Sequence, residues 1–234
     1  MKEQKNLREN KMGTTPIGKL LFQMALPMIL SMLVQALYNI VDSIFVSRID
    51  ENALTAVSLA FPIQSLMIAL GAGTGVGVNA LLSKSLGEKD FEKANKTAVN
   101  GVFLAGMSFI AFLLTGLFAV KPFYMSQTNE AQILEYGKQY LTIVCCCSFG
   151  LYTQFIFERL LQSTGKTVYT MITQGLGAII NIILDPILIF GLFGVPKMGI
   201  QGAAAATVFG QIVAMFLALI LNHAKNKEVR INFR

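Results

Sequence analysis

The stretch ALTAVSLAFPIQSLMIALGAGTGVGVNALLS, from Ala53 to Ser83, decides the fold class of this chain. It contains no charged side chain and exceeds the roughly 20 residues that a helix needs to cross a hydrocarbon core of about 30 Å. Backbone polar groups in lipid must be satisfied within the segment or in a closed barrel. Because the stretch lacks the short alternating pattern of barrel strands, it predicts a transmembrane helix.

Five further apolar blocks of this kind divide the rest of the chain. They cover Leu20–Ser47, Thr97–Val120, Tyr136–Gln162, Val168–Phe193 and Ile200–Asn222. The 234 residues are 54% hydrophobic and only 14% charged, whereas soluble domains carry about 25% charged residues. We therefore predict an all-α, polytopic membrane protein: a cytoplasmic segment over 1–19, a bundle of six transmembrane helices over 20–222, and a basic segment over 223–234.

The positions of the basic residues predict the orientation in the membrane. Six spans place both termini, and the connections after the second and fourth blocks, on one side. That side carries 15 of the 19 Lys and Arg residues, and cytoplasmic loops are the basic ones. We expect both termini to be cytoplasmic in a multi-pass protein of the plasma membrane. The net charge of +6 is then an insertion signal, so we expect membrane lipid and no nucleic acid as a partner.

Two carboxylates, Asp42 and Asp185, lie well inside the predicted spans at comparable depth. An ionised side chain in the bilayer costs at least about 2.5 kcal/mol, so each needs a partner or a function. A polar stripe at helical spacing on the first span consists of Gln35, Tyr38, Asn39 and Asp42. The two carboxylates can face each other across the bundle and form a pair that takes up and releases a proton.

The fifth block repeats this arrangement. Gln174, Asn181 and Asp185 share one helical face, and Pro186 follows directly. Proline removes a backbone hydrogen bond, and a freed carbonyl beside a carboxylate suits a proton or a sodium ion. Hydrogen bonding between helices is an equally good explanation for the uncharged residues Gln35, Asn39 and Gln174.

Other side chains give no sign of a metal site or a cofactor. Cys145, Cys146 and Cys147 are consecutive in the fourth block, a spacing that suits neither a disulfide framework nor a metal. The one histidine, His223, lies at the cytoplasmic end of the last block. We expect no cofactor, no catalytic residue and no bound metal beyond a coupling ion.

Several stretches of the chain resemble the multidrug and toxic compound extrusion family. They are LYNIVDSIFV at Leu37–Val46, ALTAVSLAFP at Ala53–Pro62, LLQSTGKT at Leu160–Thr167, NIILDPILIFG at Asn181–Gly191 and MGIQGAAAATVFGQ at Met198–Gln211. Together they cover nearly the whole chain in the family's order, as its amino-terminal half.

The resemblance implies an antiporter that exports drugs or organic cations against H⁺ or Na⁺. Family members have two six-helix lobes around a cavity that opens alternately to each side. Their amino-terminal lobe holds the cation with residues that correspond here to Asp42, Asn181 and Asp185, with Thr207 as the candidate for a threonine on the sixth helix. The family pattern needs about twice this length, so we expect a fragment, a split protein with a separate second lobe, or a homodimer, with a fragment favoured.

Three other functions are alternatives to export. A flippase for lipid-linked oligosaccharides needs a cationic groove, and the spans offer only Arg159, beside Glu158 at the cytoplasmic end of the fourth block. A membrane enzyme needs aspartate-rich, serine–histidine or metal-binding motifs, which the sequence lacks. An inactive or structural membrane subunit stays open, because half of the family pattern could keep its fold without activity.

Overall fold

The computed structural model describes residues 11–226, 228 and 229 of the chain. The described part is helical, without strands. Its elements are α1 (Lys11–Thr14), α2 (Ile17–Ser47), α3 (Glu51–Gly87), α4 (Phe91–Leu114), the π-helix η2 (Thr115–Ala119), α5 (Val120–Gln127), α6 (Ala131–Cys146), α7 (Phe149–Gln162), α8 (Thr167–Phe190), the 3₁₀ turn η3 (Leu192–Gly194) and α9 (Ile200–Lys225). Most of the predicted segment 1–19 and the basic end 230–234 lie outside the described residues.

The six apolar blocks predicted from the sequence correspond to these helices. Within the described part, α2, α3, the continuous α4–η2–α5 unit, α8 and α9 are each long and apolar enough to cross a membrane. The pair α6 and α7, bent by 44° at a short break, passes the same test together. The prediction of an all-α membrane bundle is confirmed, with a fourth span that is broken.

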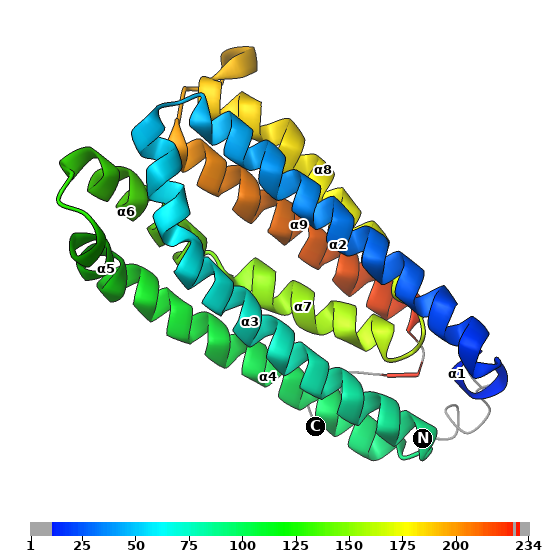
Figure 1. Cartoon of the computed structure of the whole chain (residues 1–234). Helices are drawn as coiled ribbons and strands as arrows, with labels where there is room; N and C mark the ends of the chain where they lie inside the picture. The colour runs from blue at the N-terminus through cyan, green and yellow to red at the C-terminus, as the bar shows by residue number, and fades with distance from the viewer. Residues whose placement is uncertain (1–10, 227, 230–234) are drawn as a thin grey trace.

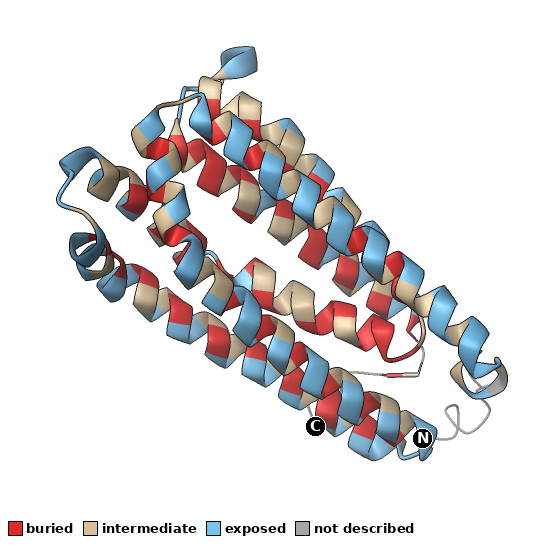
Figure 2. Cartoon of the chain, in the orientation of Figure 1, coloured by how far each residue is buried: buried red, intermediate tan, exposed pale blue. Residues whose placement is uncertain are grey.

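The helices form two groups that α6 and α7 connect. Helices α2, α8 and α9 pack together on one side, and α3 and α4 on the other (Figure 1). Helix α7 contacts α9 as well as α3 and α4, so it lies between the two groups. Buried positions follow the helix faces that meet in the interior, while exposed positions face outward (Figure 2). This arrangement brings residues of α2, α7, α8 and α9 to a common interior space.

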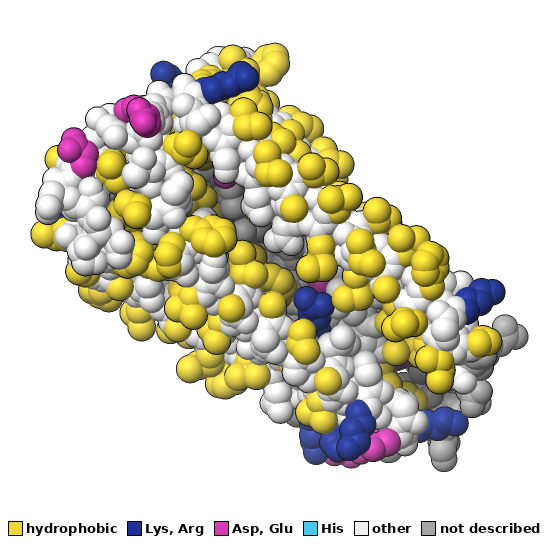
Figure 3. Space-filling view, viewed as in Figure 1, with side chains coloured by type: hydrophobic (Ala, Val, Ile, Leu, Met, Phe, Trp, Pro, Cys, Tyr) yellow, Lys and Arg dark blue, Asp and Glu magenta, His cyan; other side chains and the backbone are white. Residues whose placement is uncertain are grey.

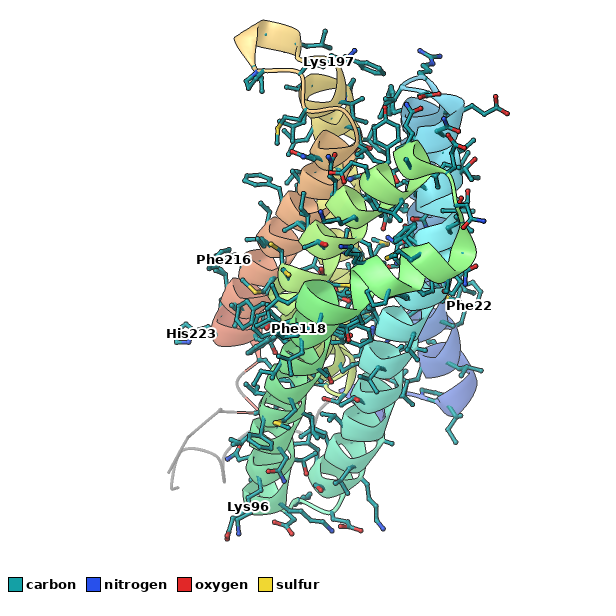
Figure 4. All side chains as sticks on the ribbon, turned by 90° about the vertical axis from the view of Figure 1, so that its left-hand side faces the viewer. Phe22, Lys96, Phe118, Lys197, Phe216 and His223 are labelled. Carbon is teal, nitrogen blue, oxygen red and sulfur yellow. The ribbon has the colours of Figure 1, made fainter. Side chains whose placement is uncertain are left out.

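The surface has the character of a protein that crosses a lipid layer. Hydrophobic side chains cover the sides of the bundle, and most of the visible charges gather toward its two ends (Figure 3). Phe22, Phe118 and Phe216 are 68%, 73% and 56% exposed on the sides of the bundle, and Lys96 and Lys197 mark opposite ends (Figure 4). Exposed phenylalanines of this extent are disfavoured in water, but lipid tails accommodate them.

The third span is longer than predicted and contains a π-helix. It runs continuously from Phe91 to Gln127, and its hydrogen bonding changes to the π pattern at Thr115–Ala119. A side chain at Gly116 would place its Cβ only 2.8 Å from Cβ of Cys145 on α6. The π-helix therefore lies at a close contact between α6 and the third span, as π-bulges mark local departures from α-helical packing.

The fourth span is not the single helix that the sequence predicted. Helix α6 ends at Cys146, and α7 starts at Phe149, so the break falls at Cys147 and Ser148. Just after it, a Cβ on Gly150 would lie 3.1 Å from Cγ1 and 3.2 Å from the backbone nitrogen of Ile212 on α9. The bend thus seats the start of α7 directly against the backbone of α9.

Glycines also bring α8 and α9 into backbone contact. A Cβ on Gly210 would lie 2.7 Å from the carbonyl oxygen of Gly177, and a Cβ on Gly202 would lie 2.6 Å from the carbonyl carbon of Leu188. Small residues allow helices in membranes to approach this closely. Helix α8 ends at Phe190 because Gly191 takes a left-handed conformation (φ 75°), three residues before the predicted end at Phe193.

Candidate functional site

The carboxyl groups of Asp42 on α2 and Asp185 on α8 meet inside the bundle. Asp42 is 8% exposed and Asp185 is fully buried, and the two carboxyl groups are close enough to interact electrostatically. Two carboxyl groups can share a hydrogen bond only if one of them carries a proton. Oδ1 of Asp42 has no hydrogen-bond partner among the described residues. The pair can therefore exchange a proton or accept a cation in its place.

Asn181 and Thr207 connect this pair to the sixth span. Nδ2 of Asn181 donates a hydrogen bond to Asp185 (3.2 Å), and its Oδ1 accepts one from Thr207 Oγ1 (3.3 Å) and one from the Thr207 backbone (3.1 Å). Asn181 is one helical turn before Asp185 on α8, which places both side chains on one face. The sequence left the register of the sixth helix open, and the structure brings Thr207 to this cluster.

A cavity lined by both polar and apolar residues adjoins the cluster. Its volume is about 70 Å³, and α2, α7, α8 and α9 each contribute to its lining. The polar lining residues are Gln35, Tyr38, Gln154, Glu158, Gln174, Asn181, Thr207 and Gln211. Of the cavity residues predicted from the sequence, Gln35, Tyr38 and Gln174 lie here.

Asn39 is not among the residues that line this cavity. Its side chain is exposed and lies with Ile40 and Ser43 on a separate, shallow surface region. The helical stripe that contains Asn39 is wide, and α2 buries Ser31, Asp42 and Val46 toward its neighbours. That orientation turns Asn39 away from the interior.

Glu158 is a buried carboxylate that the sequence analysis placed at the edge of the membrane. It is only 1% exposed, on α7, and it lines the cavity. Its carboxylate accepts hydrogen bonds from Gln154 (2.9 Å), Thr173 (2.8 Å) and Gln174 (2.7 Å). The sequence predicted its place near the cytoplasmic end of the fourth span, and the structure adds that the side chain is buried and reaches the cavity. The spacing of Gln154 and Glu158, one helical turn apart in an apolar block, was the available signal.

The described residues show no cluster of metal-ligating side chains and no disulfide. No group of three or more His, Cys, Asp or Glu side chains in them could hold a metal ion. Cys145, Cys146 and Cys147 are free thiols of increasing exposure, at the break between α6 and α7. The site that the structure assembles consists of carboxylates, amides and hydroxyls.

The helices and this interior site define a multi-pass membrane protein with a cavity inside its spans. The chain belongs to the MatE family, because the family's sequence model matches residues 27–187. That match covers α2 through most of α8, including Asp42, Asn181 and Asp185.

Relatives with known names are similar over nearly the whole chain. The FAD transporter of Shewanella oneidensis is 29% identical over 90% of this chain and 47% of its own length. The probable multidrug resistance protein NorM of Thermotoga maritima is 29% identical over 84% of this chain and 42% of its own. The chain thus spans about half the length of the curated relatives that it matches.

Solved structures give the same result. A structure described as the outward-facing conformation of a multidrug resistance MATE family transporter has a TM-score of 0.85, with 30% identity over 92% of this chain and 47% of that chain. A MOP superfamily transporter from Pyrococcus furiosus, whose description reports a binding pocket of reverse polarity, has a TM-score of 0.86 and 29% identity, and the match covers all of this chain and 50% of that chain.

Proposed function

We propose that this chain is one lobe of an exporter that moves drugs or organic cations out of the cell in exchange for H⁺ or Na⁺. The carboxyl pair of Asp42 and Asp185 carries this proposal, because a pair buried within membrane spans is costly unless it serves ion transfer. Asn181 and Thr207 supply neutral oxygens beside the pair, as a site for a proton or a sodium ion requires.

The cavity and the pair supply the two functions that an exchanger needs. Asn181 and Thr207 line the cavity and also contact or adjoin the pair, so cargo in the cavity and a cation at the pair affect the same side chains. In our proposal, loading of Asp42 and Asp185 favours a bend near Pro186 that closes the lobe and expels the cargo. A ligand shifts such an equilibrium only by binding one state more tightly than the other.

The charge of the cavity favours cationic cargo. The names of the relatives include both an FAD transporter and drug exporters, and FAD is an anion. The described residues that line the cavity include the carboxylate Glu158 and neither lysine nor arginine. An acidic lining attracts cations and repels phosphates, so we favour organic cations.

We further propose that a second six-helix unit completes the cavity. The volume of about 70 Å³ is far below the roughly 300–1,000 Å³ of a site for a drug-sized ligand. A second lobe, or a second copy of this chain in a homodimer, would add the missing wall. The basic connections at one end of the bundle favour cytoplasmic termini in the plasma membrane.

An export assay tests this proposal. Cells express either this chain alone or the chain fused to the second half of a family member, and loss of a fluorescent cationic dye is followed under an H⁺ or Na⁺ gradient. We expect gradient-driven export from the fusion, abolished by Asp185→Asn and kept by Glu130→Gln, which alters an exposed carboxylate ahead of α6. Export by the chain alone, lost with Asp185→Asn, would indicate a homodimer. Undiminished export by the Asp185→Asn fusion would refute the coupling site.

A further inference from the structure

Glu158 places a buried carboxyl group at the wall of the cavity, and the proposed coupling site does not include this residue. It lies on α7, one helical turn before the end of that helix at Gln162, and the cavity reaches it. The coupling residues Asp42 and Asp185 lie on α2 and α8 instead. A charged group in this position requires a function of its own.

Three neutral side chains form hydrogen bonds with the carboxyl group of Glu158. Gln154 and Thr173 donate to Oε1, and Gln174 donates to Oε2. Amide nitrogens only donate, so the oxygens of Glu158 act as acceptors in the contacts with Gln154 and Gln174. The hydroxyl hydrogen of Thr173 is shared with the carbonyl oxygen of Thr170. The two carboxylate oxygens offer about four acceptor positions, of which neutral donors fill at most three.

Arg159 attracts the charge of Glu158, but the described residues show no ion pair between these two side chains. Arg159 is adjacent in sequence, but its guanidinium donates to Gln162, and its side chain packs against Gly75 on α3. Glu158 reaches in another direction, to Thr173 and Gln174 on α8. The carboxyl group is therefore held by uncharged donors beside an open space, which suits a cation that arrives and leaves.

We propose that Glu158 is the anchor for the protonated amine of the cargo, with Gln154 and Gln174 as neutral donors that occupy part of its acceptor capacity. The inference rests on the proposed export function and adds to it a position for the charged group of the substrate. An alkylammonium N–H fills the open acceptor position on Glu158, which gives a charge-assisted hydrogen bond within the bundle.

The anchor is separate from the coupling site along α8. Gln174, which binds Glu158, and Asn181, which binds Asp185, are seven residues apart, or about 10 Å at 1.5 Å per residue. Both line the same cavity. Cargo and coupling ion therefore bind to different carboxylates, which lie at two levels along the same cavity.

The test measures binding to the purified full chain in lipid nanodiscs without any gradient. One probe is a dansyl fluorophore with a pentylamine tail, which is cationic at neutral pH. The other is its N-acetylated counterpart, which has the same body and no charge, so both partition into lipid through the same group. Empty nanodiscs give the background. We expect the chain to bind the amine at least about tenfold more tightly than the acetylated probe, because a cation beside an ionised carboxylate gains a charge-assisted bond.

Three variants decide between outcomes. Glu158→Gln keeps the side-chain shape and should remove the tenfold preference, while Glu130→Gln, which alters an exposed carboxylate, should keep it. Gln174→Ala removes the donor to Oε2 and should retain or strengthen the preference, which keeps the test decisive if Glu158→Gln fails to fold. An equal preference in Glu158→Gln, no preference in the unaltered chain, or loss of preference in Gln174→Ala would overturn the proposal. Because no gradient is applied, a failure of ion coupling at Asp185 leaves this result intact.

Discussion

Substitution of Gly210 by alanine should separate α8 from α9 at the level of the coupling residues. A Cβ at this position would lie 2.7 Å from the carbonyl oxygen of Gly177. That oxygen belongs to the backbone, so no side-chain rotation relieves the contact. To restore an ordinary separation of 3.4 Å, the helices must move apart by about 0.7 Å.

The magnitude of the effect follows from this displacement. A shift of about 0.7 Å lengthens the 3.3 Å contact between Asn181 and Thr207 Oγ1 to about 4 Å, which is beyond hydrogen-bonding range. Overpacking a close contact costs about 1–3 kcal/mol, and a lost hydrogen bond costs about 1 kcal/mol more. At 2–4 °C per kcal/mol for a chain of this size, the unfolding midpoint should fall by roughly 5–15 °C.

Thermal unfolding followed by circular dichroism in detergent measures the change. Gly175→Ala is the matched control, because a Cβ at Gly175 on α8 meets nothing within 4 Å and alanine is the better helix former. We expect Gly175→Ala to keep or raise the midpoint. An unfolding midpoint of Gly210→Ala equal to that of Gly175→Ala would refute the reasoning that backbone contact sets the spacing of α8 and α9.

The remaining predictions concern three other contacts. Tyr124→Phe removes the 2.7 Å hydrogen bond from the buried Tyr124 hydroxyl to the carbonyl oxygen of Ala56 and should lower the free energy of unfolding by about 1 kcal/mol, measured by denaturant titration. Gly116→Ala places a Cβ 2.8 Å from Cβ of Cys145 and should lower the unfolding midpoint by several degrees, because that contact is overpacked. Burial at the start of α8 lowers the pKa of Lys166 from its ordinary value of 10.5. The unfolded chain then binds the proton more tightly, so this residue should make stability rise with pH up to about 10.5, and Lys166→Met should remove that slope in unfolding titrations.

Each of these predictions has a contradicting result, and Gly116→Ala has a matched control. Gly106→Ala adds a Cβ with nothing within 4 Å, and a midpoint for Gly116→Ala as high as that of Gly106→Ala would contradict the packing argument. Unchanged unfolding of Tyr124→Phe would mean that the hydroxyl contributes nothing. An unaltered pH slope in Lys166→Met would assign that slope to other groups.

The number and positions of the spans could be predicted from the sequence, because long apolar blocks that exceed the bilayer core admit one solution. The break between Cys146 and Phe149 could not. It depends on the contact of Gly150 with Ile212 on α9, which lies far along the chain. Hydropathy shows that a segment avoids water, but it does not show which helix the segment packs against.

The site divides in the same way. The cost of carboxylates in lipid pointed to Asp42 and Asp185, and the structure places the two together. Their role in ion coupling stays a prediction. The sequence did not predict that Glu158 lines the cavity, because two of its hydrogen-bond donors, Thr173 and Gln174, come from the next helix. Its place beside a short turn between helices indicated only the edge of the membrane.

The length of α3 has a consequence for the lipid around the lobe. From Ala53 to Leu82 this helix carries no charged residue, and it extends over about 45 Å at 1.5 Å per residue. Helix α8, with 24 residues, is about 36 Å long, close to the thickness of an ordinary hydrocarbon core. The uncharged stretch of α3 is therefore longer than an ordinary hydrocarbon core, and tilt of α3 or local thickening of the lipid must accommodate the difference.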